Sequence, residues 1–304
     1  MREDWAPPPG ADPAYDPAPR GRVRRGLWLA RKSWSLLSQR RALWALPVLS
    51  AAAVTVAAVA LFVPAALAID PDSVSEPVIA VALVAAIVVL TFVSTFFNVA
   101  FLVMVNAHIE GEELSVGQAL GAAAGRIGPI AAWSLLTTIV GLIFRALEEV
   151  PGGELLARLV GALGGLVWSL ATFFVVPVLA VEGVGPLEAI RRSAGAFKKR
   201  WGEQVTGDVV ISGLVMLGVF ASMMLLVAGA AVASAVPVLG AAIMVLAALG
   251  LVVVLVASSA ISRVFSLVVY RHAEGRPLPT PFTPADVELA FKPRRSAFRR
   301  LLGG

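Results

Sequence analysis

The sequence predicts an all-α integral membrane protein, a bundle of six transmembrane helices with short amphipathic helices on its cytoplasmic surface. Its 304 residues are 58% hydrophobic and 15% charged, whereas soluble domains average about 45–50% apolar and about 25% charged residues. Charge-free runs long enough to cross a bilayer recur along the chain, and Lys and Arg gather between alternate runs. This composition excludes a soluble enzyme, a disordered protein and, because Cys is absent, a disulfide-stapled secreted module.

The first four spans follow from separate apolar runs. A helix needs about 20 predominantly apolar residues to cross the hydrocarbon core. The first four apolar runs satisfy this requirement, including one that Leu155 and Leu156 extend at its start. We therefore expect spans at about 42–69, 77–106, 127–145 and 155–181.

The fifth run, Val209 to Ser262, contains no charged residue and is far too long for a single crossing. Pro237 suits the first turn of a helix, where its missing N–H costs no hydrogen bond. We therefore expect two spans, at about 207–234 and 237–270, joined by a tight turn. Five or seven spans would require one of the runs to be split or buried differently.

The basic residues set the orientation. Most of the 25 Lys and Arg precede the first span, lie between spans four and five, or follow span six. The opposite loops hold only Arg145 and Arg158, beside several acids. Because positive loops stay inside, both termini are predicted to be cytoplasmic, in a cytoplasmic (inner) membrane.

Three regions are expected along the chain. Residues 1–20 are rich in Pro and lack an apolar signal-peptide core, so they predict a disordered cytoplasmic tail. Residues 21–272 form the six-helix membrane domain. Residues 273–304 form a basic cytoplasmic tail.

Two basic segments predict amphipathic helices at the membrane surface. Apolar residues recur at helical spacing before the first span and again before the fifth, with Lys and Arg elsewhere on each helix. The apolar positions are Leu27, Ala30, Trp34 and Leu37 in the first segment, and Leu187, Ile190, Ala194, Phe197 and Trp201 in the second. We expect contacts with anionic lipid headgroups from Arg31, Lys32, Arg191, Arg192, Lys198 and Lys199. The alternative is that these charges set the topology without any lipid selectivity.

The two segments also suggest an internal repeat. Superimposing Arg31-Lys32-Ser33 on Arg191-Arg192-Ser193 places Leu27 on Leu187. In the loop after the second span, Leu120, Ala124 and Ile127 align with Ile190, Ala194 and Phe197. The chain would then consist of three units, each a surface helix followed by a helical hairpin. The alternative is that any amphipathic helix leading into a span aligns equally well.

The sequence contains few residues that could form a catalytic or metal-binding site. With no Cys and two His, it has no zinc or haem constellation and none of the common nucleophile or nucleotide-binding motifs. Intramembrane polar contacts are expected from Asn98, Asn106, Asp208 and Arg263. For Asn98, a hydrogen bond to a neighbouring helix is favoured over a ligand. Asp208 and Arg263 lie at matching distances from the turn near Val236, which predicts an ion pair within the last hairpin; the alternative is that each reaches the headgroups separately.

Two stretches carry a resemblance to a known family. They are RGLWLARKSWSLLSQRRALWALPVLS and ATFFVVPVLAVEGVGPLEAIRRSAGAFKKRWGEQV. They resemble bacterial membrane proteins known only as a domain of unknown function, over roughly residues 21–290, which implies a six-helix bundle and no stated activity. The organisation is also similar to the membrane portion of glycerophosphodiester phosphodiesterases, whose catalytic barrel is absent here, so their chemistry is not carried over.

The expected function is that of a non-enzymatic membrane protein, lipid-interacting or a scaffold or accessory component. Its expected partners are anionic lipids of the inner leaflet, with no nucleic acid, no cofactor and no metal. The alternative is a small-molecule or lipid transporter with a pathway between helices that uses Asn98 or Asn106.

Overall fold

A computed structural model describes residues 22–68, 75–148, 154–201 and 211–291 of the chain, and every regular element within these ranges is helical. The all-α prediction is therefore confirmed for this part of the chain. The predicted tail of residues 1–20 lies outside the described residues.

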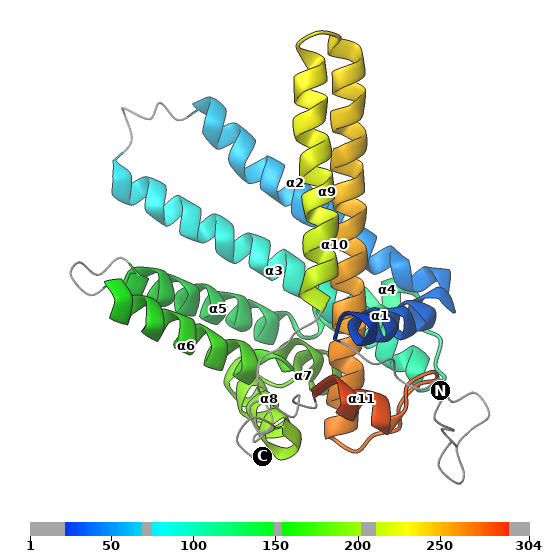
Figure 1. The fold of residues 1–304 in the computed structure, drawn as a ribbon. Helices are drawn as coiled ribbons and strands as arrows, with labels where there is room; N and C mark the ends of the chain where they lie inside the picture. Colours follow the sequence, from blue (N-terminus) through cyan, green and yellow to red (C-terminus); the bar gives the residue numbers. More distant parts are fainter. Residues whose placement is uncertain (1–21, 69–74, 149–153, 202–210, 292–304) are drawn as a thin grey trace, which may run out of the picture.

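Three helical hairpins extend in diverging directions from a common base (Figure 1). Hairpin one pairs α2 with α3, hairpin two pairs α5 with α6, and hairpin three pairs α9 with α10. Their bounds are Ala45–Ala68 and Glu76–Ile109, Ile127–Glu148 and Glu154–Thr172, and Ile211–Ala233 and Pro237–Ala273.

The outer parts of the hairpins carry exposed apolar side chains, as a lipid environment requires. Val56 on α2 is 67% exposed and Val81 on α3 is 69% exposed. Among the described residues, five stretches are long and apolar enough to cross a bilayer, which indicates a multi-pass membrane protein. They are Arg41–Leu67, Glu76–Ile109, Ile127–Leu147, Leu163–Glu182 and Pro237–Ala273. The apolar stretch found in α9, Gly218–Ala233, is shorter, so within the part of the chain that the structure describes five of the six predicted spans contain such a stretch.

The hydrophobic core lies in the base. The C-terminal parts of α3 and α10 pack there against the short helix α7 (Val175–Glu182) and against each other. Phe101, Phe174 and Tyr270 are among its largest fully buried side chains. The base is thus closed by large side chains, whereas the hairpins diverge beyond it (Figure 1).

Short helices surround this base. They are α1 (Arg22–Ser38), the 3₁₀ turn η1 (Arg41–Trp44), α4 (Val116–Ala124), α8 (Pro186–Trp201) and α11 (Pro284–Phe291). Helix α4 packs on α3, α8 packs on α6 and α7, and α1 packs on α9 and α10. The predicted basic tail from residue 273 onward therefore contains an ordered helix, α11, in which Asp286 and Val287 are buried.

The fourth predicted span, 155–181, is not one continuous helix. It is interrupted at Phe173–Phe174, between α6 and α7. Pro177 explains the break, because it has no N–H to donate to the carbonyl of Phe173 four residues earlier. Two serine hydroxyls replace the missing partners: Ser266 on α10 donates to the Phe173 carbonyl at 3.2 Å, and Ser193 on α8 accepts from the Phe174 N–H at 3.0 Å.

Each hairpin returns to the base and ends in the same way. A Glu-Gly pair lies at the C-terminal end of each of α3, α7 and α10, and its glycine has a positive φ: 83° at Gly111, 65° at Gly183 and 71° at Gly275. Glycine ends a helix in this left-handed conformation without the strain that a Cβ would cause.

Candidate functional site

The two basic triplets, Arg31-Lys32-Ser33 on α1 and Arg191-Arg192-Ser193 on α8, have the same arrangement in space. The first residue of each triplet is exposed, the second is bound to a carboxylate of the base, and the serine is fully buried. A helix turns by about 100° per residue, so three consecutive side chains reach three different environments. We call these two segments the basic triplets.

In the first triplet, Lys32 reaches the segment that follows hairpin three. Its Nζ lies 2.6 Å from Oδ2 of Asp286, and the two side chains are only 12% and 2% exposed. The same carboxylate oxygen accepts the N–H of Thr283 at 2.8 Å, at the start of α11. Nζ also lies 4.0 Å from the centre of the Trp28 ring, a cation–π contact. The ion pair therefore ties α1 to the other end of the chain.

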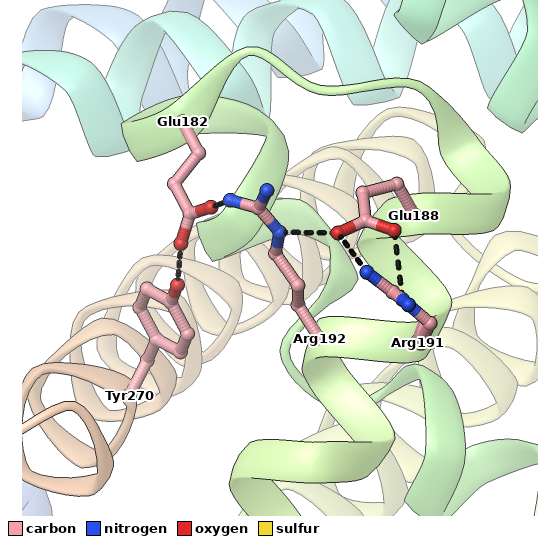
Figure 2. A network of polar contacts seen from close by, with 5 residues as sticks. All are labelled: Glu182, Glu188, Arg191, Arg192 and Tyr270. Carbon is pink, nitrogen blue, oxygen red and sulfur yellow. Dashed lines mark hydrogen bonds and ion pairs between the residues drawn. The ribbon is translucent and has the colours of Figure 1, made fainter.

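In the second triplet, Arg192 belongs to a chain of polar contacts (Figure 2). Its guanidinium donates to both Glu182 and Glu188, and Glu182 also accepts from the hydroxyl of Tyr270. One carboxylate, that of Glu182, thus joins α7, α8 and α10. Glu188 in addition binds Arg191, with Nε at 2.8 Å from Oε2, and this hydrogen bond and the negative charge raise the pKa of Arg191.

The side chains of five of the six expected headgroup cations are described, and these five fall into two groups. Arg31 and Lys198 are exposed, and the side chain of Arg191 is 79% exposed. Lys32 departs from the expectation that it faces lipid, because it is largely buried against Asp286. Arg192 is also paired, although its side chain remains 44% exposed. The side chain of Lys199 lies outside the described residues.

The buried face of each surface helix is rotated from the predicted one. On α1 the buried residues include Leu29, Ser33 and Leu36, and among the predicted residues whose side chains are described Leu37 is the one that is buried. Trp34 is 48% exposed and packs against Trp44, with ring centres 4.9 Å apart.

Helix α8 shows the same rotation. It buries Ala189, Ser193 and Ala196, whereas the predicted Leu187 is 73% exposed. Small residues form this inner face because the helix lies close against the backbone of α6 and α7. A prediction based on apolar side chains alone misses such a face.

The predicted intramembrane polar residues do not gather into one site. The Asn98 amide donates to Ser94 on its own helix at 3.3 Å. Asn106 instead accepts from Arg271 on α10 at 2.6 Å, which fits a helix–helix contact. Arg263 is half-buried in α10, while Asp208 lies outside the described residues, so their pairing stays a prediction.

Several polar residues of the base were not predicted from the sequence. Arg271, only 4% exposed in its side chain, binds Glu110 on α3 at 2.8 Å and the Pro277 carbonyl at 3.1 Å. Glu182 and Asp286, which hold the basic triplets, were missed as well. The signal available was the Glu-Gly pair, which recurs at Glu110-Gly111, Glu182-Gly183 and Glu274-Gly275.

These contacts are suited to fixing helices and presenting charge, and we assign no reaction to them. Within the described residues, no three His, Cys, Asp or Glu side chains lie together as a metal ion would require. Two positive side chains, Arg31 on α1 and Arg191 on α8, are exposed, and each has an anchoring cation beside it in sequence.

Comparison with known proteins places the chain in a family without assigning it an activity. No curated protein and no solved structure matches it significantly, so the similarity to the phosphodiesterase membrane portion has no support. A family model matches residues 77–277, more than half of the chain, from the second helix of hairpin one to the segment after hairpin three. The chain therefore belongs to the family of unknown function DUF6159.

Proposed function

We propose that this protein is a non-enzymatic, multi-pass component of a bacterial cytoplasmic membrane that contacts anionic lipid through the exposed cations of its basic surface helices. The observation that carries the proposal is the outward position of Arg31 and Arg191, at equivalent places in the two basic triplets. Each Lys or Arg near an anionic leaflet contributes about 1 kcal/mol of attraction. Such a protein would act as a scaffold or accessory component of the membrane.

Six spans with both termini in the cytoplasm fit this proposal. Helix α9 runs beside α10 (Figure 1). Since α10 is one of the stretches long enough to cross, the 23-residue helix α9 that lies along it would cross with it. The base would then face the cytoplasm, in agreement with the concentration of Lys and Arg in its sequence segments.

Cysteine labelling tests this topology, since the natural chain has no Cys. A Cβ added at Gly195 on α8 meets no atom within 4 Å, so Gly195→Cys fits the structure. In intact cells it should resist a membrane-impermeant maleimide, whereas Gly152→Cys, between α5 and α6, should react. Labelling of Gly195→Cys from outside would overturn the orientation.

The lipid contact is tested by the composition of co-purified lipid. The triple variant Arg31→Gln/Arg191→Gln/Lys198→Gln should lower the ratio of phosphatidylglycerol to phosphatidylethanolamine measured by mass spectrometry. Arg145→Gln is the matched control, because Arg145 is an exposed cation at the far end of α5 from the base. An unchanged ratio in the triple variant would remove lipid contact from the proposal.

Transport is the alternative function. Asn106 is engaged by Arg271, which leaves the half-buried Asn98 as the residue for a pathway between helices. Asn98→Cys distinguishes the two functions. Rapid reaction with a small, charged methanethiosulfonate would show a water-filled pathway and favour transport, whereas protection would favour the scaffold.

A further inference from the structure

The segments by which the three hairpins return to the base share one spacing. Each of these segments carries a phenylalanine at the same distance before its Glu-Gly pair. The three sets are Phe101 with Glu110-Gly111, Phe173 with Glu182-Gly183, and Phe265 with Glu274-Gly275. This agreement defines the register of the units independently of their surface helices.

The surface helices obey the same correspondence. Aligning the basic triplets places Leu29 on Ala189 and Ser33 on Ser193, and the matching positions of α4 are Ala119 and Ala123. All six residues are at most 5% exposed. The three helices therefore use equivalent faces to pack on the base.

The packing partners show how the units close into a ring. Helix α4 packs on α3 of hairpin one, and α8 packs on α6 and α7 of hairpin two, so each covers the hairpin that precedes it. Hairpin three is covered by α1, which comes from the beginning of the chain. In Figure 1, α1 lies across α10 near the base.

We propose that α1 is a detachable strap that docks reversibly on hairpin three and that the Lys32–Asp286 pair is its catch. Helices α4 and α8 are each joined to hairpins at both ends, so neither can move far from the base. Helix α1 is joined through η1 to hairpin one, and no residue of hairpin three adjoins it in the sequence. Its attachment to hairpin three is wholly non-covalent.

The docked state also leaves polar atoms without partners at this helix and its hinge. Ser33 Oγ and Arg40 Nη1 are buried with no hydrogen-bond partner among the described residues. Ser193 Oγ, at the equivalent position of α8, accepts the Phe174 N–H. Burying an unsatisfied polar atom is unfavourable, and water would satisfy both atoms on release of α1. Docking of α1 is therefore opposed by a cost that docking of α8 avoids.

Two contributions hold the strap in place. Leu29, Leu36 and Leu37 are buried in the base, and Lys32 meets a carboxylate that also binds the start of α11. Because that pair is largely buried, loss of one partner leaves an uncompensated charge and favours release. Release would uncover the base of hairpin three and free α11 from α1.

Maleimide labelling of the full-length protein in membranes tests the strap. In the Cys-free chain, Ser33→Cys reports whether α1 is docked and Ser193→Cys reports whether α8 is docked. Adding Lys32→Gln should increase the labelling rate of Ser33→Cys at least tenfold. Adding Arg192→Gln should change the rate of Ser193→Cys less than threefold, because α8 is tethered on both sides.

Two further variants separate release of α1 from general unfolding. Ser193→Cys in the Lys32→Gln background should remain protected, and Lys32→Arg, which keeps a cation beside Asp286, should keep the labelling of Ser33→Cys slow. The proposal is overturned if Lys32→Gln leaves Ser33→Cys protected, if Ser193→Cys opens equally in that background, or if Lys32→Arg opens Ser33→Cys as much as Lys32→Gln does.

Discussion

At the scale of residues, each basic triplet combines anchoring with presentation of charge. Arg31 and Lys32 are neighbours in sequence, yet one is exposed and the other is buried against Asp286. The sequence could predict that both positions are cationic and lie on a helix. It could not predict which cation is paired, because the acceptors Glu182 and Asp286 come from other segments of the chain.

Replacing Glu182 by Gln should lower stability, because this carboxylate receives both Arg192 and Tyr270. A hydrogen bond to a charged group contributes about 1.5–3 kcal/mol, and we expect a loss in the lower part of that range, since Arg192 is partly exposed. Thermal unfolding in detergent measures the change. Arg191→Gln is the control, with a much smaller effect expected because its ion pair with Glu188 is exposed to solvent. A Glu182→Gln effect no larger than that of the control would contradict this role.

The two buried serines should respond in opposite ways to alanine. Ser193→Ala removes the acceptor of the buried Phe174 N–H, and we expect a cost of about 1–3 kcal/mol for the unsatisfied donor. Ser33→Ala removes a buried hydroxyl that has no partner among the described residues, so stability should be unchanged or increased. Chemical unfolding of the two variants under the same conditions gives the comparison, and equal losses would show that the serines are not distinguished by hydrogen bonding.

At the scale of elements, the limits of a span were easier to predict than its interior. The sequence placed one span at about 155–181, and the structure has α6 and α7 with a break at Phe173–Phe174. Hydropathy is insensitive to such a break, since both halves are apolar. Pro177 was a visible sign of it, but the serines that make the break tolerable come from α8 and α10, which no local pattern connects with it.

Pro177 and Ser266 should therefore be energetically coupled. Pro177→Ala supplies an N–H that can donate to the Phe173 carbonyl, in place of the Ser266 hydroxyl. Ser266→Ala should then be less costly in the Pro177→Ala background, with a coupling energy of about 0.5–1.5 kcal/mol. A double-mutant cycle on unfolding measures this energy. Strict additivity of the two effects would show that Pro177 does not create the need for Ser266.

At the scale of the whole molecule, composition and charge were sufficient for the all-α class and for the series of hairpins. Five spanning stretches appear among the described residues where six were predicted. The ring of surface helices was less accessible to sequence reasoning. Its inner faces are made of Ala and Ser, as at Ala189 and Ser193, and α1 meets its partner hairpin at the opposite end of the chain. The periodicity of apolar residues predicts neither an inner face of small residues nor a contact between distant segments.

The correspondence of the three units makes a gain-of-function prediction, which rests on the proposed lipid contact. The place of Arg31 on α1 and Arg191 on α8 is taken on α4 by Gly121, and a Cβ there meets no atom within 4 Å. Gly121→Arg should therefore present a third outward cation at the same level of the base. At about 1 kcal/mol per charge near an anionic leaflet, enrichment of phosphatidylglycerol over phosphatidylethanolamine should rise by up to about fivefold.

Gly121→Gln is the matched control for this variant, since it adds a long polar side chain and removes the same helical glycine without adding charge. Its lipid ratio should equal that of the unmodified chain, and raising the salt concentration should reduce the gain of Gly121→Arg but leave the control unchanged. If Gly121→Arg gave the same lipid ratio as Gly121→Gln, the outward position of a cation on these helices would not be what attracts anionic lipid. If Gly121→Arg raised the lipid ratio but the loss of Arg31 and Arg191 did not lower it, an added positive charge near the base would attract anionic lipid. The positions of Arg31, Gly121 and Arg191 would then not be equivalent in lipid binding.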